Sequence, residues 1–210
     1  MVELPLASEA TGGDVLVRGL TKEGVPDAPD GLGAHLEDRG FEGELGVVVW
    51  VPGDGGSRLF VGLGPAEELG PRAVRRAAAG AAKALGKHEA AATTLLSDAD
   101  AVDAAGAQAL AEGFALGAYR YLAKKSEPEA HELAAVRVLD DGDGVADGLA
   151  RGARIAEAVN AARDLVNEPG GDLTPPVFAD RARELVEAGG VTVEVLDKAA
   201  IEAAGLGGLL

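Results

Sequence analysis

Hydrophobic and polar residues follow two different periods along this chain, and the changes of period predict its elements. Short apolar or alternating runs of strand length occur at 14–18, 45–51, 58–61, 90–96 and 132–139. Apolar residues at helical spacing lie between several of these runs. Strands that alternate with helices in this way predict a three-layer α/β domain over residues 14 to about 140.

Two helices of this predicted domain have recognisable starts. One begins near Pro71, and its apolar face repeats at helical spacing at Val74, Ala78, Ala81 and Leu85. The other is capped by Asp98 or Asp100 and continues to Leu122, with small apolar residues on most sides. Such a helix is expected to pack closely against a sheet.

A helix, a turn, a second helix and a strand are predicted in the last third of the chain. Apolar residues at helical spacing define a helix that begins near Ala150 and that Asn167 closes: Ile155, Val159, Ala162 and Val166. Thr174 is a predicted N-cap, with Pro175 at the first helical position, where an N–H would have no intrahelical partner. Alternating valines then predict a strand over 191–196.

This last unit needs a sheet to cover its apolar faces, and residues 197–210 are too few to supply the missing strands. We therefore expect the chain to be truncated at its carboxyl end. We also expect the tail to expose apolar surface at Phe178, Leu185, Val186 and the strand at 191–196, which favours association.

Composition narrows the classes of function. The chain has no cysteine, which excludes disulfides and thiolate chemistry and fits a cytoplasmic protein. Its net charge of -16 opposes binding to nucleic acid, because a phosphate backbone attracts an excess of Lys and Arg. No apolar run is long enough to cross a bilayer, and residues 1–13 lack the pattern of a signal peptide.

Three glycine-rich or acidic loops could suggest a ligand site. Residues 52–56 join two apolar runs and indicate a hairpin rather than a phosphate loop. Residues 62–64 (Gly-Leu-Gly) lack the third glycine of a dinucleotide fingerprint, since position 67 is Glu67, and indicate a strand-to-helix turn. Residues 140–144 (Asp-Asp-Gly-Asp-Gly) fail the EF-hand spacing and need no ion before a helix N-terminus.

Candidate catalytic residues are not spelled out by the sequence. His35, His88 and His131 lie far apart and suit surface or loop positions better than metal ligation. The G-x-S-x-G, Walker and H-E-x-x-H patterns are all missing from the sequence. From the residues alone we assign no catalytic, cofactor-binding or metal-ligating residue.

Several runs of the sequence resemble the leucine (cytosol) aminopeptidase family. The resemblance is strong over Arg-Asp-Leu-Val-Asn-Glu-Pro at 163–169, Leu-Thr-Pro at 173–175 and Val-Thr-Val-Glu-Val-Leu-Asp at 191–197. The final Gly-Leu-Gly-Gly-Leu-Leu at 205–210 also resembles the family, whose more usual second residue there is methionine. Upstream, Glu-Gly-Phe-Ala-Leu-Gly-Ala-Tyr-Arg-Tyr at 112–121 is similar to its amino-terminal domain, and the likeness is looser before residue 60.

The resemblance implies a macro-like amino-terminal domain over 1–148 and, over 149–210, a linker helix with the incomplete start of an α/β catalytic domain. Family members are cytoplasmic homohexamers that use two divalent metal ions, manganese or zinc, to remove amino-terminal, leucine-like residues from peptides. The family's Asp, Glu and Lys ligands have no counterpart in these residues, so the chain alone is expected to bind no metal and to be inactive. A stand-alone macro-like module for small ligands and a pseudoenzyme subunit remain as alternatives.

Overall fold

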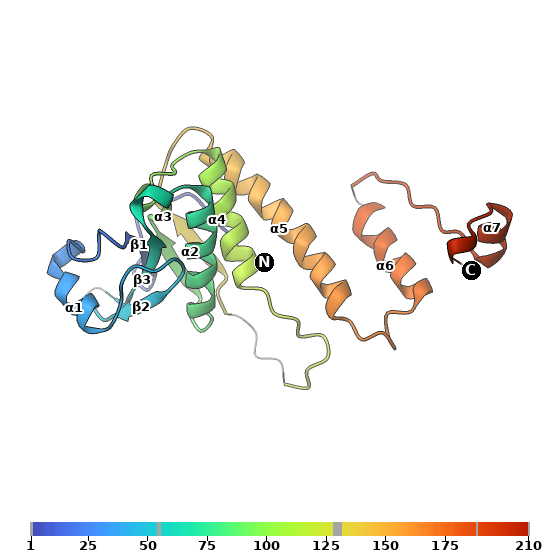
Figure 1. Ribbon diagram of the computed structural model, residues 1–210, viewed down its shortest axis with the longest axis horizontal. Helices are drawn as coiled ribbons and strands as arrows, with labels where there is room; N and C mark the ends of the chain where they lie inside the picture. Colours follow the sequence, from blue (N-terminus) through green and yellow to red (C-terminus); the bar gives the residue numbers. More distant parts are fainter. Residues whose placement is uncertain (1, 54–55, 128–131, 188, 210) are drawn as a thin grey trace. The chain divides into compact units, whose positions relative to one another are not determined.

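The computed structural model describes residues 2–53, 56–127, 132–187 and 189–209. Contacts divide the chain into two compact units, residues 1–160 and residues 161–210. Each unit is described by itself below, and Figure 1 labels their elements.

A mixed five-stranded sheet in the order β2-β3-β1-β4-β5 is the centre of the first unit. The strands are β1 (Val15–Thr21), β2 (Val48–Val51), β3 (Arg58–Gly64), β4 (Ala90–Thr93) and β5 (Ala135–Val138). β1 pairs in parallel with β3 and β4, and β4 pairs in parallel with β5. β2 pairs with β3 in antiparallel fashion at one edge, so the predicted hairpin is confirmed. The sequence thus predicted all five strands, although their ends differ.

Helices connect these strands and continue into the second unit. Unit 1 contains η1 (Pro29–Gly31), α1 (Gly33–Asp38), η2 (Ala66–Glu68), α2 (Pro71–Ala84), α3 (Leu95–Asp98) and α4 (Ala104–Gly117). α5 (Val145–Asn167) begins in unit 1 and ends in unit 2. Unit 2 also contains α6 (Pro175–Glu187), α7 (Lys198–Ala203) and η3 (Gly207–Leu209). None of the helices in the described ranges is long and apolar enough to cross a bilayer.

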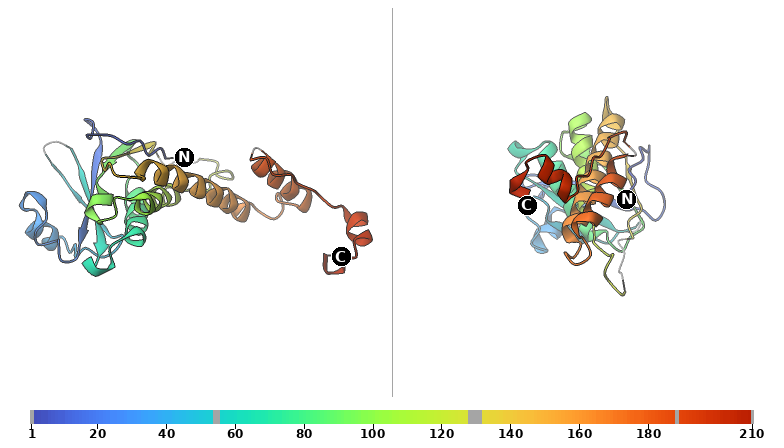
Figure 2. Two further views of the ribbon diagram at one scale, coloured as in Figure 1. Left: turned by 90° about the horizontal axis from the view of Figure 1, so that it is seen from above. Right: turned by 90° about the vertical axis from the view of Figure 1, so that its right-hand side faces the viewer.

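The two faces of the sheet contact different hydrophobic cores, because neighbouring strand residues point to opposite faces. Val17 of β1 and Leu59 and Val61 of β3 belong to the larger core, which includes α2 and α4. Phe60, the residue between the last two, belongs to a smaller core with Leu36 of α1. Helices therefore lie against both faces of the sheet, with α1 opposite α2 and α4 (Figure 2).

Glycines set the spacing of the helix layer. A Cβ at Gly113 of α4 would lie 2.5 Å from the carbonyl oxygen of Arg75 in α2. A Cβ at Gly152 of α5 would lie 2.3 Å from the carbonyl oxygen of Gln108 in α4. These contacts leave room only for hydrogen at the two positions, so the helix backbones approach one another closely.

Three predicted boundaries were wrong. The run 90–96 ends as a strand at Thr93, and Leu95 begins the short helix α3. α4 begins at Ala104 with Asp103 as its N-cap, whose side chain accepts from the Gly106 N–H at 2.7 Å. It ends at Gly117 rather than at Leu122. Asp98 is unavailable as a cap because it contacts β1, and Asp100 has a positive φ of 49°.

Two further predictions need correction. Residues 62–64 continue β3 to its end at Gly64, and the turn toward α2 follows through η2. The helix predicted to begin near Ala150 is α5, which begins at Val145. The loop of 140–144 therefore leads directly into a helix, as the acidic turn predicted.

In unit 2 the predicted second helix is confirmed as α6, which begins at Pro175. The predicted strand at 191–196 is wrong, because no strand is assigned there. A strand exists only through its hydrogen-bonded neighbour, and no described residue pairs with this segment. Phe178, Leu185 and Val191 are exposed at 49%, 50% and 56%, as predicted, whereas Val186 is partly buried.

Candidate functional site

Ligands of open α/β sheets bind at the carboxyl ends of the strands, so the carboxyl ends of β1 and β4 are a candidate site. Here α3 follows β4 directly and carries Asp98 back to β1. One carboxylate oxygen of Asp98 accepts from the Gly19 N–H at 2.7 Å and from the Thr94 hydroxyl at 2.9 Å. The other lies 3.3 Å from Arg18 Nη2. A ligand at this position would have to displace these contacts.

Burial determines the ionisation of Asp98. Loss of hydration raises the pKa of its carboxyl group above 3.8, although the bond from Gly19 and the nearby Arg18 charge act in the opposite direction. The side chain is 11% exposed. A raised pKa often marks a functional group, but the donors around Asp98 also suit a structural tie between β1 and α3.

Asp140 makes a second tie at the same edge of the sheet. Its carboxylate accepts from the Leu96 N–H at 3.1 Å and from the Ser97 hydroxyl at 2.5 Å. The acidic loop that could have suggested calcium therefore supplies a cap to α3. No local pattern could have predicted this role, because Asp140 and Leu96 are 44 residues apart.

The two histidines of the described ranges, His35 and His88, have separate surroundings. His35 lies exposed on α1. His88 stacks on Trp50 with ring centroids 4.9 Å apart. His131 lies outside the described residues.

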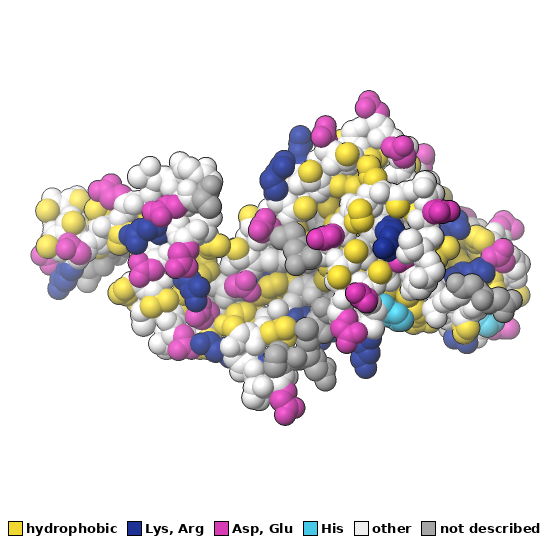
Figure 3. Space-filling view, turned by 180° about the vertical axis from the view of Figure 1, so that it is seen from behind, with side chains coloured by type: hydrophobic (Ala, Val, Ile, Leu, Met, Phe, Trp, Pro, Cys, Tyr) yellow, Lys and Arg dark blue, Asp and Glu magenta, His cyan; other side chains and the backbone are white. Residues whose placement is uncertain are grey.

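The two-metal centre implied by the resemblance does not fit the residues in the described part of the chain. No group of three or more His, Cys, Asp or Glu side chains comes together there. Asp98 and Asp140 already accept from N–H and O–H donors, which a cation would have to replace. The enclosed carboxylates of Asp14 and Glu112 are paired with Arg137 and Arg75. Other acidic side chains are scattered with Lys and Arg over the face shown in Figure 3.

The residues that carry the resemblance in unit 2 have turn and capping contacts. The Leu173 N–H donates to the Pro169 carbonyl at 2.9 Å, and the Phe178 N–H donates to the Thr174 carbonyl at 2.8 Å. Asn167 Nδ2 donates to the Arg163 carbonyl at 2.8 Å, one turn back in α5. These bonds define the end of one helix and the start of the next.

Both parts of the chain match models of one protein family. Residues 21–128 match the N-terminal domain of the cytosol aminopeptidase family, and residues 160–210 match its catalytic domain. The chain belongs to the cytosol aminopeptidase family. This confirms the resemblance found in the sequence.

Relatives in this family are longer than the present chain. A probable cytosol aminopeptidase of Rhodococcus opacus is 41% identical over 94% of this chain and 42% of the relative. One from Mycobacterium ulcerans is 44% identical over 73% of this chain and 30% of the relative. The chain thus spans at most about two fifths of the length of these two relatives.

Solved structures support the same family and fold. The bottromycin maturation enzyme BotP, in complex with Mn, is 37% identical with a TM-score of 0.76, over 92% of this chain and 40% of that one. A mutant of tomato leucine aminopeptidase has a TM-score of 0.81 over 97% of this chain and 46% of that one. At 21% identity the tomato protein supports the fold alone.

Proposed function

We propose that this chain is the amino-terminal part of a cytosolic leucyl aminopeptidase, a two-metal enzyme that removes leucine-like residues from the amino ends of peptides. Residues 1–148 form a three-layer, macro-like domain in this proposal. Residues 149–210 form the linker helix and the start of the catalytic domain.

The observation that carries the proposal is the order of the two family matches, amino-terminal domain first and catalytic domain second, on one chain. Divalent metals in such an enzyme supply Lewis-acid chemistry and activate water. Because the described residues do not fit a metal centre, we derive no catalytic step from them. We assign no catalytic, cofactor-binding or metal residue to the chain, and the metal centre belongs to the longer protein.

The amino-terminal domain then contributes architecture and access of the substrate rather than chemistry. It belongs to a cytoplasmic homohexamer that binds neither nucleic acid nor membrane. The alternative of a free-standing small-ligand module is less well supported, since α3 and the Asp98 contacts occupy the carboxyl ends of β1 and β4.

The test is to express the 210-residue chain and a product extended past Leu210 by the continuing coding sequence. Release of amino-terminal leucine from a peptide is measured with manganese, with zinc and with a chelator. We expect metal-dependent release by the extended product alone. Metal-dependent release by the 210-residue chain would contradict the proposal, and a coding frame that stops at Leu210 would favour the binding-module or pseudoenzyme alternative.

A further inference from the structure

Among the described strands, the edge strand β2 is paired on one side only, with β3. Val48 lies opposite Val61 of β3, and the Gly62 N–H donates to the Val47 carbonyl at 2.8 Å. In this register Val48 and Trp50 are the non-hydrogen-bonded positions, so their backbone N–H and C=O groups point away from β3. On this outer edge, Arg39 Nη1 donates a long hydrogen bond of 3.5 Å to the Trp50 carbonyl oxygen, which an added strand would replace. No described strand pairs with this edge.

A groove of about 720 Å³ lies between α2 and the segment that leads into β2. One wall is the chain from Leu45 to Val48, in which Val47 is 45% exposed. The other wall is α2, and the two walls touch where a Cβ at Gly80 would lie 2.3 Å from the Gly46 carbonyl oxygen. This contact fixes the distance between the edge strand and the helix.

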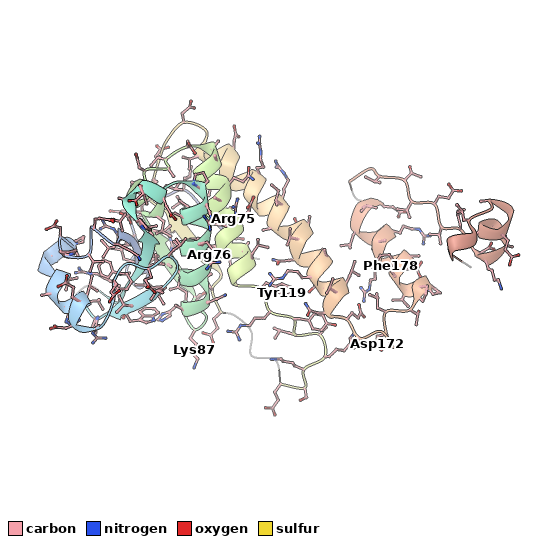
Figure 4. The ribbon with its side chains drawn as sticks, viewed as in Figure 1. Arg75, Arg76, Lys87, Tyr119, Asp172 and Phe178 are labelled. Atoms are coloured by element: carbon pink, nitrogen blue, oxygen red, sulfur yellow. The ribbon has the colours of Figure 1, made fainter. Side chains whose placement is uncertain are left out.

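The rim of this groove is positively charged. Arg76 and Lys83 line it one turn before and about one turn after Gly80, and the lining contains no carboxylate. Arg72 and Lys87 extend the row of cations at either end, and Figure 4 labels Arg76 and Lys87. All four are exposed, and within the described ranges none of them forms an ion pair, whereas Arg75 on the same helix is paired with Glu112. Unpaired cations in a row are unexpected in a chain with a net charge of -16.

We propose that this groove binds an extended acidic peptide segment of another protein, which adds a strand to β2. The backbone of the segment pairs with Val48 and Trp50, and its alternate side chains point toward α2. Carboxylates at those positions meet Arg76 and Lys83, while the intervening apolar side chains lie beside Val49 on the opposite face. Charge complementarity selects this occupant, because the cations lack carboxylate partners within the described chain.

The probe is a fluorescein-labelled peptide of four Val-Glu repeats with blocked ends, so that it is no substrate for an aminopeptidase. Its fluorescence anisotropy is titrated with the full 210-residue chain. We expect the double variant Arg76→Glu with Lys83→Glu to weaken binding by about tenfold or more, as reversal of complementary charges does. The matched control is Arg151→Glu with Arg154→Glu, two exposed arginines of α5, which changes the net charge equally and is expected to leave binding unchanged.

A second probe tests the strand pairing without altering the protein. The same peptide with N-methyl groups on alternate residues loses the N–H groups that pair with β2, and it is expected not to bind. The proposal would be overturned if the methylated peptide or a Val-Lys peptide bound as well as the Val-Glu peptide does. It would also be overturned if the Val-Glu peptide bound equally to both double variants. Sedimentation showing that these cations bind a second copy of the chain would overturn it too. A complete lack of peptide binding would also overturn it, and the cations would then protect the edge strand against edge-to-edge aggregation.

Discussion

At the scale of single residues, two aspartates hold the carboxyl edge of the sheet together. Asp98 joins α3 to the backbone of β1, and Asp140 joins the loop before α5 to the start of α3. The partners are 79 and 44 residues apart in the sequence. Neither role could be predicted from local pattern, because a carboxylate gives no local sign of which distant N–H it will meet.

Asp98 gives the native state a defined pH dependence. Because burial raises its pKa in the folded protein above 3.8, the native state holds this proton more tightly than the unfolded chain does. Its contribution to stability is therefore full below pH 3.8 and is lost as the pH rises through the raised pKa. We expect the free energy of unfolding of the wild type, relative to that of Asp98→Asn, to decrease as the pH rises from 3.8 through the raised pKa of Asp98.

Urea denaturation at a series of pH values measures this difference. Asp143→Asn, at an exposed loop position, serves as the matched control and is expected to retain the wild-type pH dependence. A wild-type advantage over Asp98→Asn that grows with pH would show that the donors around Asp98 outweigh its burial.

At the scale of elements, the helix layer depends on backbone contacts at glycine. Gly113 of α4 lies against Arg75 and Ala78 of α2, where an added Cβ would approach the Arg75 oxygen to 2.5 Å and the Ala78 Cβ to 2.6 Å. Alanine is the better helix former by about 1 kcal/mol. In this position the clash with a backbone atom prevails over that preference.

We expect Gly113→Ala to reduce the free energy of unfolding by about 1–3 kcal/mol, since overpacking forces the two helices apart. Thermal and urea unfolding measure the change. Gly12→Ala is the control, because a Cβ there has no atom within 4 Å. An unchanged or higher stability of Gly113→Ala would mean that α2 and α4 can separate without loss.

Sequence pattern predicted elements better than their ends. The run at 90–96 is apolar throughout, yet the chain leaves the strand because the Thr93 hydroxyl accepts from the Leu95 N–H at 3.2 Å and Asp140 accepts from the Leu96 N–H. One of these bonds is local and the other is tertiary. The valines at 191–195 show the converse case, in which a strand pattern has no partner strand among the described residues.

At the scale of the whole molecule, the two units differ in how they bury apolar side chains. Unit 1 encloses Phe60 and Phe114, which are 1% and 0% exposed. No residue of α6 or α7 in unit 2 is buried. The second unit therefore offers apolar surface for association.

We expect Phe178→Asp with Leu185→Asp to reduce self-association of the 210-residue chain, because both side chains are about half exposed on α6. Sedimentation velocity over a range of concentrations measures it. Arg181→Ala with Arg183→Ala alters the net charge by the same amount without removing apolar surface, and is expected to associate as the wild type does. Equal loss of association in both variants would attribute the effect to charge.

The strand order has a consequence for how the protein is made. β1 is synthesised first but lies in the middle of the sheet, and β2 does not pair with it. Both β1 and β2 pair with β3. The nascent chain therefore contains no strand pair of the final sheet until Arg58–Gly64 has left the ribosome. The remaining strand pairs of the sheet form only after β4 and β5 have been synthesised. Sheet assembly is therefore a late, long-range event during translation.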